Sequence, residues 1–278
     1  MDSALTVFIH IHKCAGSSLA AVMRRNLFRP QPELAASLEL DTLTPPNLVA
    51  SILRTARRDG YVMGHLGYGA HRIFASPCRY FTMLREPRER LISLWRHAAS
   101  TPNAYYHQAA KDLSFASFLA QRNPLELYNG MVRFLSGDPA GLNVFINPKP
   151  FGTLDQSDLD RALHNLAHRF EGFGLVSQFD ASLLLMKHSM GYRNCFYVRR
   201  NESSSAVAKP EFPDLALPLV EFDQALVAEA ERIFQQRVSS DTKVRASRLK
   251  RFRSLNHAMQ PITKINQVLQ QSISYLKP

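Results

Sequence analysis

The chain has 278 residues, of which 45% are hydrophobic and 21% charged, the balance of a soluble globular protein with a large core. No run approaches the roughly 18 apolar residues of a membrane span, and no charged-then-apolar leader precedes the first predicted strand. The three cysteines, Cys14, Cys78 and Cys195, are odd in number and widely spaced, so we expect a reducing, cytoplasmic location rather than a disulfide framework.

The net charge of +11 is concentrated at the C-terminal end of the chain. Residues 241–278 contain eight Lys or Arg against one acidic residue, which gives this tail a charge of +7. Such an excess favours anionic partners such as nucleotides, acidic glycans or anionic lipid. Because no nucleic-acid-binding motif accompanies the charge, we expect no nucleic-acid partner.

Short β-rich runs alternate with helical periodicity along the chain. Strands that are apolar on both faces and separated by helices predict an α/β fold with a central parallel sheet covered on both sides. The ligands of such sheets bind at the carboxyl ends of the strands. We expect strands at 5–11, 61–64, 79–84, 172–176 and 194–199, and helices at 17–28, 45–58, 87–98, 112–121, 125–136, 156–169, 179–190 and 221–238.

Residues 1–238 are expected to form one domain and residues 239–278 a separate tail. In the tail, 239–254 is predicted to be a basic linker, and the apolar spacing from Leu255 onward predicts an amphipathic helix with Pro261 in its first turn. That helix could dock on its own domain, pair with a second copy, or lie on a membrane surface beside the basic linker.

The first motif, residues 8–19 (FIHIHKCAGSSL), is predicted to be a buried strand, a short loop and the start of a helix. Backbone N–H groups at a helix N-terminus bind phosphate well. In this loop Ala15 and Gly16 allow close approach of an anion, Ser17 and Ser18 add hydroxyl donors, and Lys13 adds a positive charge.

Two other phosphate loops do not fit this spacing. A nucleotide triphosphatase loop has its lysine after the glycines, whereas Lys13 precedes Gly16. A tyrosine-phosphatase-like loop has an arginine several residues after its cysteine, whereas Cys14 is followed there by alanines. Cys14 is therefore interpreted as a loop residue rather than as a nucleophile.

The second motif, residues 81–93 (FTMLREPRERLIS), is also predicted to be a strand, a turn and a helix. Arg85 leaves the strand with a fork suited to bidentate phosphate contact, and Pro87 fits the first helical turn. Ser93 lies further along the same helix. Two such sites predict a ligand with phosphate groups at both ends.

With these residues the chain resembles the carbohydrate sulfotransferases that use 3′-phosphoadenosine 5′-phosphosulfate (PAPS), most closely the soluble bacterial relatives of the heparan and uronyl 2-O-sulfotransferases. Residues 13–19 resemble the 5′-phosphosulfate loop of that family and 84–93 its 3′-phosphate motif. Further similarity covers 62–65, 128–137, 163–192 and 201–203. The resemblance implies a P-loop NTPase-like three-layer α/β/α sulfotransferase fold.

The resemblance also implies transfer of a sulfuryl group from PAPS to a hydroxyl of a carbohydrate or glycoconjugate, without a metal. Lys13 would stabilise the departing phosphate, and His65, at the end of a predicted strand, is the candidate general base. His71 is the nearest rival to His65. The donor-binding residues implied are Lys13, Cys14, Ala15, Gly16, Ser17, Ser18, Arg85, Ser93, Asn201 and Ser203.

Three points remain open in the sequence. Arg133 could bind an anionic acceptor or the donor, but a salt bridge within the fold is equally compatible with its position, and His71 is a second candidate for substrate contact. His12 stands where the family usually has proline, and His10 shares its strand face, but no third metal ligand is evident. Alternative functions are a sulfotransferase for lipid or small-molecule hydroxyls, a small-molecule kinase, and a non-catalytic protein that binds anionic glycans or membranes.

Overall fold

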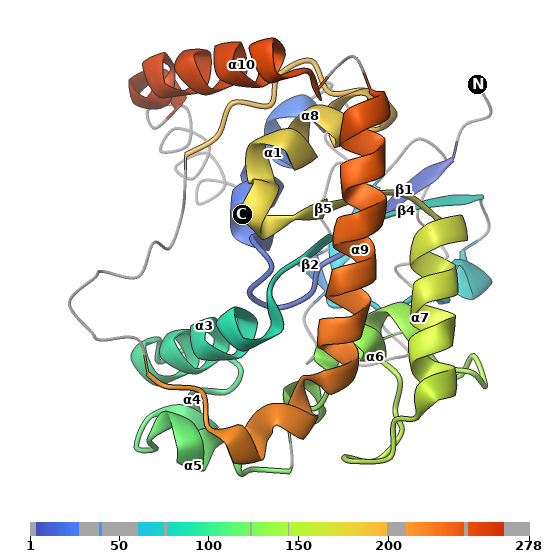
Figure 1. The fold of residues 1–278 in the computed structure, drawn as a ribbon, viewed down its shortest axis with the longest axis vertical. Coiled ribbons are helices and arrows are strands. Elements are labelled where there is room, and N and C mark those ends of the chain that lie inside the picture. The colour runs from blue at the N-terminus through green and yellow to red at the C-terminus, as the bar shows by residue number, and fades with distance from the viewer. Residues whose placement is uncertain are drawn as a thin grey trace, which may run out of the picture.

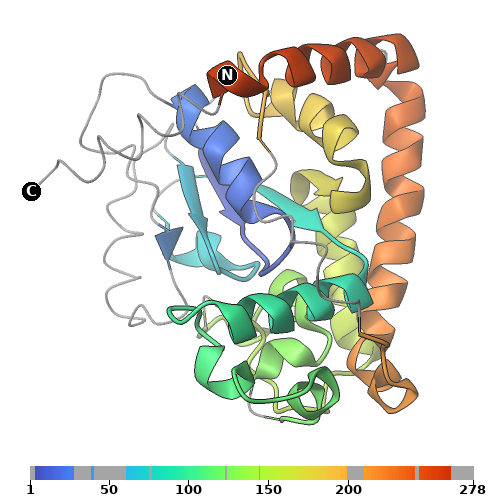
Figure 2. The same ribbon diagram turned by 90° about the vertical axis from the view of Figure 1, so that its left-hand side faces the viewer.

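The computed structural model describes residues 4–27, 39–40, 61–74, 77–122, 124–143, 145–198, 210–241 and 244–263. Within these ranges the chain forms a parallel sheet with helices packed around it (Figures 1 and 2). The predicted helix 45–58 lies outside the described residues.

The sheet has five described strands in the order β2-β3-β1-β4-β5, and all neighbouring pairs are parallel. All five residues of β1 are buried, as the run of apolar side chains in the sequence predicts for a strand covered on both faces. The register pairs Ile9 of β1 with Gly64 of β3 and with Thr82 of β4, so β1 and β3 end at the same level and β4 extends two residues further, to Leu84. The bounds are β1 Leu5–Ile9, β2 Glu39–Leu40, β3 Tyr61–Gly64, β4 Cys78–Leu84 and β5 Phe170–Leu175.

Most predicted helices are confirmed with small shifts at their ends. Helix α9 runs along the molecule from the end formed by α3, α4 and α5 to the end formed by α10 (Figures 1 and 2). The helices are α1 Gly16–Leu27, α3 Pro87–Ser100, α4 His107–Ala110, α5 Phe115–Leu119, α6 Gly130–Ser136, α7 Gln156–His168, α8 Phe179–Ser189, α9 Glu221–Ser240 and α10 Ala246–Ala258. Short 3₁₀ segments are η1 Ala70–Ile73, η2 Leu125–Leu127, η3 Val176–Gln178 and η4 Asp214–Leu219.

Three predicted elements differ from the structure. The segment 194–198 is not a strand; Tyr197 is held instead by the side chain of Asn256, which accepts a hydrogen bond from its backbone N–H at 2.8 Å. The predicted helix 112–121 is shorter, since α5 begins only after Ser114, whose hydroxyl caps it. The predicted helix 125–136 is interrupted by Asn129, which has a left-handed backbone (φ 49°).

The basic linker predicted at 239–254 is wrong over most of its length, because α10 occupies Ala246–Ala258 and packs on α8. Phe252 and Asn256 are its buried residues, while its arginine and lysine side chains face solvent. The pattern that starts at Leu255 continues into residues 264–278, which lie outside the described residues. Among the helices that the structure describes, none is long and apolar enough to cross a membrane.

Candidate active site

Three candidate residues gather because their strands are neighbours in the sheet. Lys13 follows β1, His65 follows β3 and Arg85 follows β4, and these strands lie side by side in the order β3-β1-β4. The carboxyl ends of parallel strands meet at one edge of a sheet, where open α/β folds bind their ligands. The three side chains line one cavity of about 1090 Å³.

The loop between β1 and α1 has an unusual backbone. Lys13 and Ala15 both have positive φ values, 65° and 59°, which non-glycine residues seldom adopt outside functional loops. Gly16 starts α1, and a Cβ atom at this position would lie 1.8 Å from Nε2 of His10. A side chain at position 16 would therefore have to displace the His10 ring, which favours glycine here.

The N-terminus of α1 faces the cavity. Ala15, Gly16, Ser17 and Ser18 all line it, and α1 has no acidic residue in its first turn. The first N–H groups of a helix have no partner within the helix, and the helix dipole adds partial positive charge there. This end of α1 is suited to an anionic group.

Lys13 is partly buried beside the loop. Burial, followed by the positive charge of Arg85, lowers the pKa of Lys13 from 10.5 to about 8. An anion bound in the cavity would favour the charged form of this lysine.

Cys14 does not line the cavity. Its side chain is 1% exposed, its N–H donates to the carbonyl oxygen of Ile11 at 3.2 Å, and burial raises the pKa of its thiol to about 12. Because its backbone N–H is already hydrogen-bonded and its sulfur is buried, the structure argues against the contact between Cys14 and PAPS that the resemblance implied. They agree with the interpretation that Cys14 is not a nucleophile.

Arg85 and Ser93 form the second part of the cavity wall. Arg85 donates from Nη1 to the carbonyl oxygen of Lys13 at 3.2 Å, and its Nη2 lies 3.7 Å from Oε2 of Glu89. The Glu86 carboxylate caps α3 by accepting from the N–H groups of Arg88 and Glu89. An anion at Arg85 would therefore lie beside Ser93 rather than at the capped N-terminus of α3.

His65 is oriented by the backbone of the first loop. Its Nδ1 lies 2.6 Å from the carbonyl oxygen of His10. A carbonyl oxygen can only accept, so the His65 proton is on Nδ1 and the lone pair is on Nε2. This tautomer has the nitrogen lone pair that a general base requires.

The His65 ring lies within a stack of three imidazoles. Its centroid is 3.4 Å from that of His12, with 10° between the planes, and 4.5 Å from that of His10, with 24° between them. Burial, then the neighbouring His65 and His12, hold the pKa of His10 well below its usual value. In the part of the chain that the structure describes, no group of three or more His, Cys, Asp or Glu side chains could hold a metal ion.

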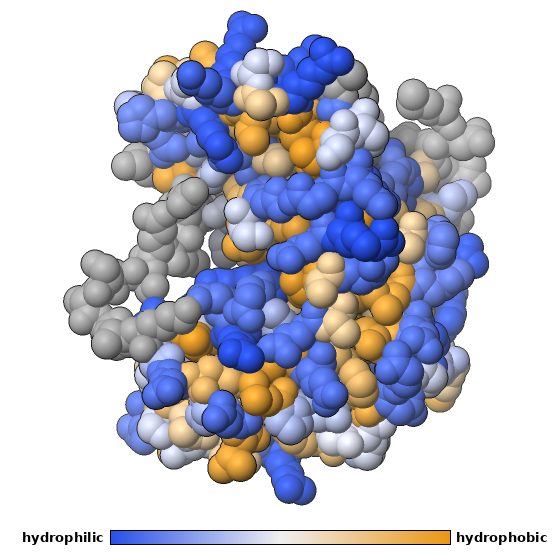
Figure 3. Space-filling model, viewed as in Figure 1, coloured by the Kyte–Doolittle hydropathy of each residue, from blue (hydrophilic) through white to orange (hydrophobic). Residues whose placement is uncertain are grey.

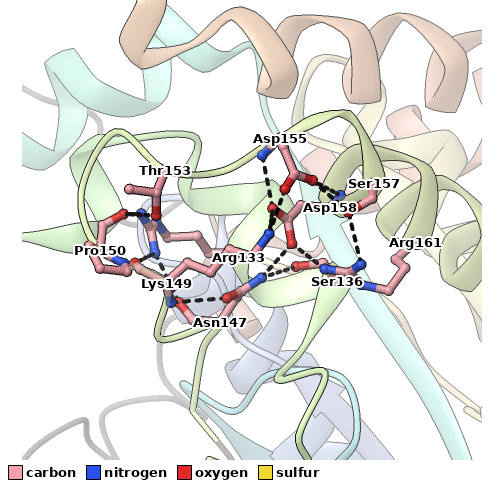
Figure 4. Close-up of polar contacts among 10 residues, drawn as sticks. All are labelled: Arg133, Ser136, Asn147, Lys149, Pro150, Thr153, Asp155, Ser157, Asp158 and Arg161. Carbon is pink, nitrogen blue, oxygen red and sulfur yellow. Dashed lines mark hydrogen bonds and ion pairs between the residues drawn. The ribbon is translucent and has the colours of Figure 1, made fainter.

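Arg133 has a structural position, which does not support the predicted contact with substrate. It is fully buried, and its guanidinium donates to the carbonyl oxygens of Tyr128, Asn147, Lys149 and Pro150 at 2.6–3.2 Å. Figure 4 shows it inside the loop that leads to α7, beside the network around Asp158. Of the two uses left open for Arg133, the structure favours the one within the fold, although its partners are carbonyls rather than a carboxylate.

The remaining candidates lie elsewhere. His71 is in η1, where its Nδ1 lies 3.0 Å from the Tyr80 hydroxyl, and it does not line the cavity. This position speaks against His71 as a substrate contact or as a rival base. Asn201 and Ser203 lie outside the described residues.

Sequence reasoning did not find Glu126, a buried side chain that contacts His12. Glu126 Oε1 lies 2.8 Å from Nδ1 of His12, and the Tyr106 hydroxyl donates to Glu126 Oε2 at 3.2 Å. Glu126 is 114 residues from His12 along the chain, and no local pattern around it signals the contact. The presence of His12 where a proline was expected was the one available signal.

A family comparison agrees with this geometry. The model described as "Sulfotransferase family" matches residues 3–141, the part of the chain that supplies Lys13, His65, Arg85 and Ser93. No curated protein matches the chain. Because the matched region is half of the chain and contains the three strand ends that form the cavity, the chain belongs to the sulfotransferase family, a class of PAPS-dependent transferases.

Proposed function

We propose that the protein transfers the sulfuryl group of PAPS to a hydroxyl of a carbohydrate or glycoconjugate acceptor. The observation that carries this proposal is the convergence of Lys13, His65 and Arg85 on one cavity at the edge of the sheet. Family membership implies the donor. The acceptor and the residue roles are proposals.

The two anionic ends of the donor fit the two parts of the cavity wall. The N-terminus of α1, with Ser17 and Ser18, would bind the 5′-phosphosulfate, and Arg85 with Ser93 would bind the 3′-phosphate. Lys13 stands at the loop entrance, where its charge would stabilise the negative charge that develops on the departing phosphate. A protein group that stabilises developing charge in this way typically raises the reaction rate by about 10²–10³.

His65 would remove the proton of the acceptor hydroxyl. Its Nε2 has the lone pair because Nδ1 donates to His10. As the acceptor oxygen forms its bond to sulfur, its proton moves to Nε2 and the S–O bond to the phosphate breaks. The protonated ring would keep its hydrogen bond to the His10 carbonyl, so the proton transfer needs no rearrangement.

The acceptor would enter from the side of the cavity lined by the C-terminal end of α3 and the loop that follows. Tyr105 is 48% exposed there and packs edge-to-face with Tyr106 at 4.6 Å. Exposed aromatic side chains can stack on sugar rings, which favours a carbohydrate over a lipid hydroxyl. His107 does not line the cavity, and its Nδ1 donates to the carbonyl oxygen of Ala98 at 2.7 Å.

Radiolabelled transfer tests the proposal. The protein is incubated with ³⁵S-labelled PAPS and a panel of desulfated heparin, chondroitin and dermatan, and incorporation is measured beside that of K13A and S93A variants. We expect label in at least one saccharide, lost with K13A. The proposal is wrong if the protein binds magnesium–ATP in calorimetry but not adenosine 3′,5′-bisphosphate, the result expected of a kinase.

We also propose a cytoplasmic location. Cys14, Cys78 and Cys195 are all free thiols, which fits a reducing compartment. The compartment can be checked directly by fractionation of cells that express the protein.

A further inference from the structure

His12 joins the candidate base to a buried carboxylate. On one side its Nδ1 lies 2.8 Å from Glu126 Oε1, and on the other its ring lies flat against His65 with centroids 3.4 Å apart. A carboxylate can only accept, so His12 donates from Nδ1.

Glu126 is a rigid anchor for His12. Its side chain is 2% exposed, and its second oxygen accepts from the Tyr106 hydroxyl at 3.2 Å. Its backbone carbonyl accepts from Nη2 of the fully buried Arg90 at 2.7 Å. Burial alone would raise the pKa of Glu126, but the charge and hydrogen bond of His12 hold that pKa at about 2, so the carboxylate stays ionised.

The His65 ring is thereby restrained in two directions. The carbonyl of His10 restrains rotation within the ring plane through Nδ1, and the face of His12 restrains tilting of that plane. A base that is held in one orientation avoids the loss of rate that comes from a misplaced catalytic group. We propose that the Glu126–His12 pair is a positioning device in which Glu126 holds the His12 ring, and the face of that ring holds His65 in its Nδ1–H tautomer, with Nε2 as the basic nitrogen. The proposal rests on the proposed role of His65 as the base.

Imidazole ¹⁵N NMR tests the pair without an activity assay. The histidine-labelled full chain is studied at about pH 8, where ordinary imidazoles are neutral, and the His65 signal is assigned from its loss in H65A. Two variants with the same charge are compared. H12F/E126Q keeps an aromatic face against His65, whereas H12L/E126Q fills similar space without one.

We expect H12F/E126Q to keep the native excess of the Nδ1–H tautomer at His65, and H12L/E126Q to reduce the ratio of Nδ1–H to Nε2–H by roughly threefold or more. The single variant E126L, which removes the hydrogen-bond acceptor of His12, should reduce it in the same direction and serves if H12L/E126Q does not fold. Calorimetry with adenosine 3′,5′-bisphosphate should give the same affinity for the native chain and H12F/E126Q.

A native ratio in both H12L/E126Q and E126L would overturn the proposal, as would an equal fall in H12F/E126Q and H12L/E126Q. These NMR outcomes can be distinguished from a failure of the proposed function, which is measured by ³⁵S transfer. If H65A still transferred ³⁵S while the tautomer ratios changed as expected, His65 would not be the base, but the pair would still position its ring.

Discussion

At the scale of single residues, the lowered pKa of Lys13 predicts how the activity depends on pH. Its pKa of about 8 means that the free protein loses this charge as the pH rises through about 8, well below the range of an ordinary lysine. Because kcat/KM reports the ionisation of the free enzyme, we expect kcat/KM for PAPS to fall above about pH 8.

The control for this profile is K13R, whose guanidinium stays charged over the whole range. This variant should lose the decline above about pH 8 even if its rate is lower throughout. A native profile that stays flat to about pH 10 would show that the charge of Lys13 does not assist donor use.

Glu126 gives a second prediction, on stability. Its pKa is lowered from 4.5 to about 2 in the folded protein, so its charge contributes stability that is fully present above about pH 4.5 and is lost as the pH falls toward 2. That shift corresponds to roughly 3 kcal/mol, at about 1.4 kcal/mol per pKa unit. E126Q should therefore be less stable than the native chain at pH 6, and the difference should shrink toward pH 3.

Urea unfolding at several pH values measures this difference. Glu231, an exposed residue of α9, provides the matched control E231Q, which should follow the native curve. If E126Q and E231Q showed the same acid dependence, the Glu126–His12 contact would not stabilise the fold.

At the scale of elements, Arg133 connects α6 to the loop before α7 through hydrogen bonds to four backbone carbonyls. Removing the guanidinium leaves those buried carbonyls without their hydrogen-bond donors. Each carbonyl that water cannot reach then lowers the free energy of unfolding by about 1–3 kcal/mol. We expect R133M to lower the free energy of unfolding by about 3 kcal/mol or more and to leave the affinity for adenosine 3′,5′-bisphosphate unchanged.

Urea unfolding and calorimetry of R133M separate this structural role from the ligand contact first considered. R161M is a suitable comparison, because Arg161 is partly exposed and its guanidinium contacts the side chains of Ser157 and Asp158 in the same network. Native stability together with weakened ligand binding in R133M would restore Arg133 to the site.

Several elements could be predicted from the sequence because their signals are local. The mostly apolar run of β1, and Pro87 in the first turn of α3 after the Glu86 cap, fix those elements within one or two residues. The placement of Lys13, Arg85 and His65 at strand ends also followed from position in the sequence. The shared cavity then depends only on β3, β1 and β4 being neighbours.

Features set by contacts distant in sequence could not be predicted. Arg133 has the same sequence environment whether it binds a ligand or four carbonyls, and the loop that supplies three of those carbonyls lies 14–17 residues away. The segment at 194–198 is β-rich, but Asn256 of α10 holds it outside the sheet. No pattern around Glu126 signals its contact with His12, which lies 114 residues earlier in the chain.

At the scale of the whole molecule, the basic residues of α10 lie apart from the cavity. The end of the molecule where α10 lies carries projecting hydrophilic side chains in Figure 3, and Arg248, Lys250 and Arg251 are exposed on that helix. None of the three lines the cavity. We expect R248S/K250S/R251S to reduce retention on anionic vesicles or heparin resin, and to leave the affinity for adenosine 3′,5′-bisphosphate within about twofold of native.

Co-sedimentation with vesicles and calorimetry measure the two properties on the same preparations. If the protein were instead a non-catalytic binding protein, K13A should keep its binding to vesicles or glycans, and the triple variant should lose it. Loss of nucleotide affinity in the triple variant would contradict the separation of the tail charge from the site.

The central claim is that one edge of the sheet binds the donor and presents His65 to the acceptor. The most direct test is the rate of ³⁵S transfer by H65A at saturating PAPS, to the saccharide labelled by the native protein, with donor affinity measured in parallel. We predict native affinity for adenosine 3′,5′-bisphosphate and a transfer rate lower by about 10²–10⁴, the usual contribution of a general base. A transfer rate within a few fold of native would contradict the account.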